Sequence, residues 1–108
     1  MKQLKEHISI LTYIRSLSPK DQKNFIKTAS RPLLEVLSSI ALNIIKRNIP
    51  LTKKDITKLR RYEQLIKKLS EKKHSLVSRR KMLTTGGFLS SLLSLLPTLV
   101  SGVLANLQ

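Results

Sequence analysis

The charged side chains are confined to the first three quarters of the chain, and this division limits what the sequence can fold into. All 21 Lys and Arg residues and all 6 Asp and Glu residues lie before position 82, and 82–108 contains no charged side chain. A leucine-rich uncharged segment must bury its apolar side, whereas a segment dense in cations stays in contact with water or with a polyanion. We therefore divide the chain into a basic helical domain, 1–85, and an uncharged amphipathic C-terminal helix, 86–108.

The few Gly and Pro residues predict an all-helical fold. The sequence has three Gly and four Pro in 108 residues, and they lie where helical patterns begin or end. Ser18-Pro19 and the segment 30–32 each place a Ser just before a Pro, a combination that favours the first turn of a helix. At this length there is room for one small core. We expect an all-α protein, a small helical bundle with a C-terminal amphipathic, Pro-kinked helix.

Apolar periodicity within the basic domain indicates a series of helices. The segment 33–45 is apolar on most sides, so we expect it to be the central helix of the bundle. Thr52, three residues before Asp55, predicts a capping box at the start of the next helix. One apolar face then continues from Ile56 to Leu69, which predicts a single helix through this region. A break near residue 74 and a short basic helix follow.

The C-terminal segment 88–107 has the clearest helical periodicity in the sequence. Ser and Thr line its polar side, and Pro97 in its middle removes one backbone hydrogen bond and is expected to kink the helix. Twenty residues would reach about 30 Å, which equals the hydrocarbon thickness of a bilayer, but the polar residues bring the insertion free energy toward zero. Two alternatives stay open: the helix lies in a membrane interface, or it packs on the bundle or on another copy. The face that would contact membrane or partner consists of Phe88, Leu92, Leu96, Leu99 and Val103.

The basic charge points to a polyanionic partner. The net charge is +15 and the calculated pI is about 10.8, which favours phosphate backbones or anionic lipid headgroups over a neutral metabolite. Cations are densest in 53–81, where they surround the apolar face described above. Contacts of this kind bind phosphates with little regard to base sequence. The expected nucleic-acid-binding residues are Lys53, Lys54, Lys58, Arg60, Arg61, Lys67, Lys68, Lys72, Lys73, Arg79, Arg80 and Lys81.

Nothing in the sequence predicts an enzyme. There is no Cys, which excludes thiolate zinc sites and cysteine nucleophiles. His7 and His74 lie far apart in the sequence, and the carboxylates show no paired or metal-binding spacing. Gly86-Gly87 matches no phosphate-binding loop pattern. We therefore expect no catalytic residues, no metal and no cofactor.

The segment 49–96 resembles a family of small basic proteins in Polinton/Maverick elements and adintovirus-like viruses. The shared features are PLT at 50–52, KLRRY at 58–62, the basic run KKHSLVSRRK at 72–81 and GGFL at 86–89, followed by a leucine-rich end. The similarity covers rather less than half of the chain. It implies a virion component similar in role to adenovirus-type core or minor capsid proteins, which condense DNA or disturb membranes, and which would be found in the virion and, during assembly, in the host nucleus.

The same resemblance gives Gly86 and Gly87 a second interpretation. Adenovirus-type maturation proteases cut after a Gly-Gly pair that follows an aliphatic residue two positions earlier, and here that position is Thr84. The pair is therefore a candidate processing site, although a helix stop is the simpler interpretation.

These observations lead to one principal hypothesis and two alternatives. The first is a non-enzymatic viral or mobile-element protein that binds nucleic acid, expected to be DNA, through phosphate contacts during genome packaging. The second is a membrane-active or membrane-anchored minor capsid protein that acts through the C-terminal helix. The third is a host-directed adaptor in which that helix fills a partner's groove. Anionic membrane, a capsid protein and a second copy of the chain are further candidate partners.

Overall fold

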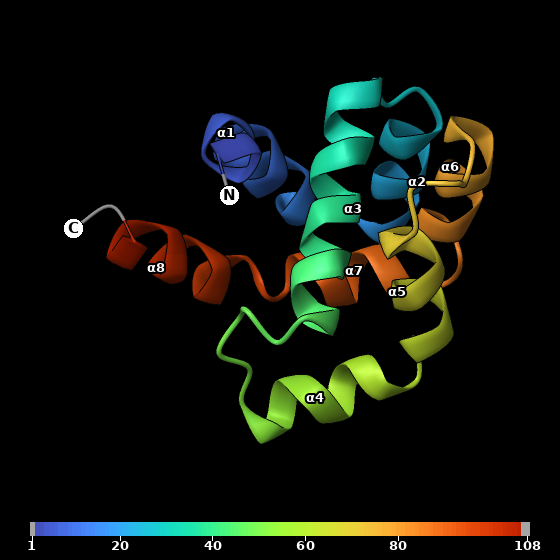
Figure 1. The fold of residues 1–108 in the computed structure, drawn as a ribbon. Helices are drawn as coiled ribbons and strands as arrows, with labels where there is room; N and C mark the ends of the chain where they lie inside the picture. The colour runs from blue at the N-terminus through green and yellow to red at the C-terminus, as the bar shows by residue number, and fades with distance from the viewer. Residues whose placement is uncertain (1, 107–108) are drawn as a thin grey trace.

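The computed structural model describes the backbone of residues 2–106 and the side chains of residues 4–101. In this part of the chain all regular secondary structure is helical, which confirms an all-α small helical bundle (Figure 1). The helices in chain order are α1 (Lys2–Ser16), α2 (Pro19–Lys27), α3 (Arg31–Ile45), α4 (Lys53–Arg60), α5 (Glu63–Ser70), α6 (Leu76–Leu83), α7 (Phe88–Leu93) and α8 (Leu96–Asn106).

Side chains just outside the helices account for several of the helix starts. The hydroxyl of Ser18 accepts a hydrogen bond from the amide of Asp21 at the start of α2. At α4 the capping box is complete, because Thr52 Oγ1 accepts from the Asp55 amide and Asp55 Oδ2 accepts from the Thr52 amide, both at 3.1 Å. The N-cap Ser30 of α3 makes no such side-chain bond. The sequence signals therefore located the starts correctly, even where the capping bond is absent.

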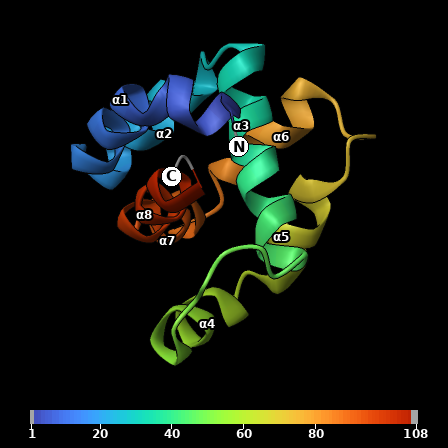
Figure 2. The ribbon, with the colours of Figure 1, turned by 60° about the vertical axis from the view of Figure 1, so that its left-hand side comes forward.

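Helix α3 is the centre of the bundle, as the width of its apolar surface predicted. It packs most extensively against α5 and also contacts α1 and α6. Figure 2 shows α3 between α1 and α2 on one side and α5 on the other. Its buried residues are Leu33, Leu34, Val36, Leu37, Ile40 and Ala41.

The uncharged segment belongs to the same core as the basic helices. Helices α7 and α8 contact α1, and α7 also contacts α4 and α6. Phe88 is the largest fully buried side chain, and the buried leucines of α7 and α8 join those of α1 and α3 in one hydrophobic cluster. The boundary drawn at Gly86 thus marks a change in chemistry and a helix break within one packed unit.

The basic helix expected after Thr52 is interrupted at residues 61 and 62. Tyr62 leaves the helical conformation with φ −110° and ψ 16°, and α5 begins after it. Its ring lies 5.5 Å from the ring of Phe88, and its hydroxyl donates to the carbonyl oxygen of Gly86 at 3.1 Å. These contacts with residues more than twenty positions away hold Tyr62 inward, and α4 turns away below the bundle (Figure 2).

The predicted bend in the C-terminal helix is confirmed, and it falls just before Pro97. Helix α7 ends at Leu93, and Pro97 is the second residue of α8, where a missing amide hydrogen costs no helical bond. In a continuous helix, residue 97 would donate its amide hydrogen to the carbonyl oxygen of Leu93. Pro97 has no such hydrogen and its ring crowds that oxygen, so the helix breaks there. The periodic segment is consequently two helices.

Gly87 is the residue whose replacement should reveal how tightly the α6–α7 connection is held. It has φ 81°, and a Cβ placed on it would lie 2.6 Å from the Tyr62 hydroxyl oxygen. A Gly87→Ala substitution should therefore lower the free energy of unfolding by about 1–3 kcal/mol, through the left-handed backbone and this overlap. Chemical denaturation monitored by circular dichroism measures the change.

Gly86 provides the matched control, because a Cβ there would meet no atom within 4 Å. Gly86→Ala should change stability by less than about 0.5 kcal/mol. Combining Gly87→Ala with Tyr62→Phe should recover part of the loss, since the overlapping oxygen is then gone. Equal losses for the two Gly variants would contradict the described geometry.

Candidate nucleic-acid interface

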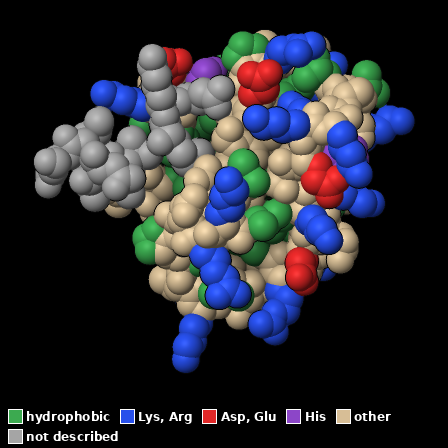
Figure 3. All heavy atoms as spheres, viewed as in Figure 1, with side chains coloured by type: hydrophobic (Ala, Val, Ile, Leu, Met, Phe, Trp, Pro, Cys, Tyr) green, Lys and Arg blue, Asp and Glu red, His purple; other side chains and the backbone are tan. Residues whose placement is uncertain are grey.

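Most of the predicted cations form an exposed basic surface on α4, α5 and the segment that follows them. Space-filling spheres show Lys and Arg side chains spread over this face, with few carboxylates among them (Figure 3). We call this set the basic surface. The exposed members are Lys53, Lys54, Lys58, Arg60, Arg61, Lys67, Lys68, Lys72, Lys73 and Lys81.

The short helices set the directions in which these cations project. Helix α4 carries Lys53 and Lys54 in its first turn and Arg60 in its last, and α5 ends with Lys67 and Lys68. Cations in a last turn interact favourably with the negative end of the helix dipole, whereas Asp55 offsets the cations at the start of α4. Because α4 and α5 point in different directions, the basic surface curves around the molecule instead of following one straight stripe (Figure 1).

Few carboxylates neutralise the basic surface. In the described part of the chain, Lys73 is its one member in an ion pair, with Nζ 3.1 Å from Glu71 Oε2. The hydrogen bond from Lys73 lowers the pKa of Glu71 below 4.5, and the charges of Lys73, His74 and Lys67 act in the same direction against partial desolvation. Glu71 therefore stays ionised at neutral pH, and the other exposed cations remain free to meet phosphates.

Arg79 and Arg80, which were predicted together with the other binding cations, are not exposed members of the basic surface. Arg79 is buried, and its Nη2 donates to the backbone oxygen of Lys72 at 3.2 Å. Arg80 is half-buried, and its Nη2 donates to the backbone oxygen of Ala29 at 2.8 Å. The two guanidinium groups thus fasten α6 to the connections before α6 and before α3. Because α6 has only a short apolar face, these hydrogen bonds help to hold the helix in place. A charge count alone could not distinguish the two arginines from the exposed Lys81.

Adjacent cations on α6 allow the structural role of Arg80 to be tested. Arg80→Met should lower the free energy of unfolding by about 1.5–3 kcal/mol, because a hydrogen bond from a charged donor to Ala29 is lost. Lys81→Met removes the same charge from an exposed position and should change stability by less than about 0.5 kcal/mol. Thermal or urea unfolding compares the two, and equal stability of both variants would show that the Arg80 contact contributes nothing.

The apolar face predicted to meet a membrane or a partner is inside the protein. Phe88, Leu92, Leu96 and Leu99 are each at most 3% exposed, while the side chain of Val103 lies outside the described residues. The open alternative of packing on the bundle is therefore the one that the structure adopts, with α7 against α1, α4 and α6 and α8 against α1. No described helix alone is long and apolar enough to span a membrane, and one pair bent by 83°, Leu76–Leu83 with Phe88–Ser101, meets length and composition criteria together.

Truncation of Leu92 distinguishes a core helix from a detached one. Leu92 is 1% exposed, so Leu92→Ala should lower the free energy of unfolding by about 2–5 kcal/mol through lost burial and a cavity. Val77→Ala, at a position 60% exposed on α6, should cost less than about 1 kcal/mol. Denaturant titration of both variants checks this, and an unchanged stability of Leu92→Ala would mean that α7 is not docked.

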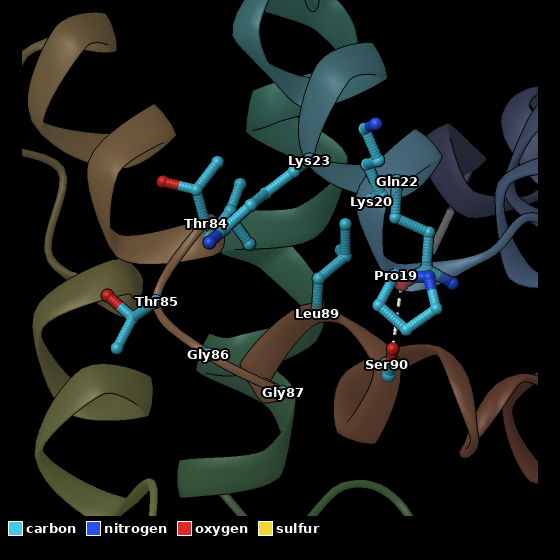
Figure 4. A pocket seen from close by; sticks show the side chains of 11 residues that line it. Pro19, Lys20, Gln22, Lys23, Thr84, Thr85, Gly86, Gly87, Leu89 and Ser90 are labelled. Carbon is cyan, nitrogen blue, oxygen red and sulfur yellow. Dashed lines mark hydrogen bonds between the residues drawn. The ribbon is translucent and has the colours of Figure 1, made fainter.

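The Gly86-Gly87 pair lies in the exposed connection between α6 and α7. It lines a pocket of about 280 Å³ opposite α2, with Lys20 and Lys23 on the other wall (Figure 4). Below this pocket the hydroxyl of Ser90 donates to Gln22 Oε1 at 2.7 Å, and Gln22 Nε2 donates to the backbone oxygen of Ile14. The pair ends α6 and allows α7 to start, as a helix stop does. Cleavage at this pair stays a prediction.

Sequence reasoning missed the contribution of Arg47 to the basic side of the molecule. Arg47 has a positive φ of 58° after the end of α3, and together with Arg60 and Lys67 it lines a largely apolar groove of about 890 Å³ between α3, α4 and α5. Nothing in the local sequence marks Arg47, because its neighbours in space come from helices that begin later in the chain.

Among the described residues no three His, Asp or Glu side chains gather in a way that would hold a metal ion. His74 is half-buried beside Glu71, with 3.7 Å between Nε2 and Oε2.

Comparison with known proteins identified no relative of this chain. No protein-family model matches the chain, and the searches of curated proteins and of solved structures found no significant match.

Proposed function

We propose that this protein is a non-enzymatic nucleic-acid-binding protein that contacts phosphate backbones irrespective of base sequence. The observation that carries the proposal is the basic surface, with its ten exposed Lys and Arg side chains. In the described part of the chain, Lys73 is the one member of this surface that pairs with a carboxylate. Such a surface releases condensed counterions from a polyanion, and this release favours binding.

The dimensions of the molecule suit several simultaneous phosphate contacts. The second-longest extent of the protein is 29 Å. A DNA duplex of this length carries about 17 phosphates, counted over both strands. About half of these would face the protein, so the exposed cations are sufficient for roughly six to nine contacts. Tyr62, the aromatic residue of 53–81, packs against Phe88. The basic surface therefore presents no free aromatic ring for unstacked bases, and backbone contacts are the mode that we propose.

The resemblance of 49–96 to small basic proteins of Polinton-type elements supports a role in genome packaging as a virion core component. Dense, weakly neutralised cations on a small fold suit the condensation of DNA. The membrane and adaptor alternatives both require the C-terminal apolar face, and the burial of that face in the core favours neither of them.

A salt series tests this function directly. The affinity for two unrelated duplexes of equal length should fall linearly as log affinity against log salt, with a slope of about −5 to −8 for both duplexes. Fluorescence anisotropy measures both. Weak binding at low salt, or tight binding to one duplex alone, would overturn the proposal.

Charge reversal locates the interface. Replacing Lys53, Lys54 and Lys58 together by Glu should weaken binding to all duplexes alike and flatten the salt slope by about 3. The matched control replaces Lys20, Lys23 and Lys27 of α2 by Glu, which gives the same net charge with α4 and α5 unchanged. Equal weakening by both triple variants would mean that overall charge, and not the basic surface, governs binding.

A further inference from the structure

A polar pocket beside α3 gathers most of the buried side-chain atoms that lack a hydrogen-bond partner. The pocket has a volume of about 460 Å³ and lies between α3 and the segment that joins α5 to α6. Within the described side chains, four buried polar atoms have no partner, and three belong to residues that line this pocket: Ser38 Oγ, His74 Nε2 and Arg79 Nε. Buried polar groups in folded proteins are nearly always paired, so this concentration calls for an explanation.

The three atoms share the ability to donate a hydrogen bond. An arginine Nε is always a donor, a serine hydroxyl donates readily, and a histidine Nε2 donates in one tautomer and when protonated. Arg79 is only 8% exposed, and its hydrogen bond to the Lys72 oxygen uses Nη2 and leaves Nε unpaired. His74 Nε2 is 3.7 Å from the nearest Glu71 oxygen, which is beyond hydrogen-bond range. These three donors therefore lack a hydrogen-bond acceptor.

Charges around the pocket favour an anionic acceptor. Arg31 and Lys72 line it with exposed side chains, and Glu35 is the carboxylate on its wall. With Arg79, three permanent cations oppose two acids, because Glu71 also lies near the pocket, 3.7 Å from His74 Nε2. The pocket also includes Ser75 and Leu76, the N-cap and first residue of α6, where the positive end of the helix dipole attracts anions.

We propose that this pocket binds a phosphate group, recognised by Ser38, Arg79 and the start of α6. Phosphate offers four oxygens in a tetrahedral arrangement and so accepts several hydrogen bonds at once, and arginine is well suited to it. The volume exceeds that of the bare ion and falls in the range of small-ligand sites, so the phosphate comes either as the free ion or on the 5′ end of a nucleic acid. The site is distinct from the basic surface, to which it is joined through Lys72.

The first experiment is a titration of the full chain with inorganic phosphate, followed in ¹H–¹⁵N spectra through the Arg79 Nε–H signal. A saturable shift of this signal is expected, with none on addition of chloride at the same ionic strength. A shift that is absent, or equal with chloride, would overturn the proposal.

Two variants and a matched control assign the binding to the pocket. Ser38→Ala removes a hydroxyl that has no partner in the fold, so it should leave stability unchanged and weaken phosphate binding about fivefold. Lys72→Ala should weaken phosphate binding about threefold, while Lys68→Ala, which removes the same charge from α5 outside the pocket, should not. Unchanged phosphate affinity in both Ser38→Ala and Lys72→Ala would refute the site.

Duplex ends separate the two sources of phosphate. If the nucleic-acid end is the source, a duplex with 5′-phosphates should bind more tightly than one with 5′-hydroxyls, and Ser38→Ala should abolish the difference. If the two duplexes bind equally while inorganic phosphate still saturates the pocket, the free ion is the ligand. Loss of phosphate binding with a steep salt slope intact would defeat this proposal alone, and the reverse result would defeat the proposed function alone.

Discussion

Burial of the uncharged segment in the shared core, where it contacts α1, α4 and α6, is the interaction on which the rest of the structure depends. Helices α4 to α6 have narrow apolar faces and many cations, and their mutual repulsion opposes a compact state. The segment that follows them supplies Phe88 and a series of leucines to the single core. Because it brings no charge of its own, it adds apolar area without adding repulsion. The basic helices are thus stabilised by sharing a core with a segment that carries no charge.

The two arginines of α6 show how this arrangement shapes the interface. Arg79 and Arg80 donate hydrogen bonds to backbone oxygens of residues 72 and 29. The Arg79 bond fixes the connection from which Lys72 and Lys73 project. The exposed cations are positioned by groups of the same charge that face inward. A polyanion that binds the folded protein would relieve the remaining repulsion and stabilise the fold by mass action.

The sequence was sufficient for the fold class, because Ser, Thr and Pro mark helix starts through local chemistry, as at Ser18 and Thr52. The sequence was insufficient where a contact with a residue far along the chain determines the local structure. The break at Tyr62 depends on Gly86 and Phe88, and periodicity within 53–70 carries no trace of them. The apolar face of α7 and α8 was recognised, but amphipathicity does not say whether membrane, partner or core covers it. Likewise, a charge count predicted twelve binding cations alike, and it could not show that Arg79 and Arg80 donate to backbone oxygens of residues 72 and 29.

The position of α7 and α8 in the chain has a consequence for biosynthesis. A ribosome adds residues from the N-terminus at about 5–20 per second, so 53–81 is made before the helices that complete its core. During that interval α1 lacks the contacts that α7 and α8 supply, while the lysines of α4 and α5 are already present. The nascent chain thus carries its full positive charge before its apolar core is complete.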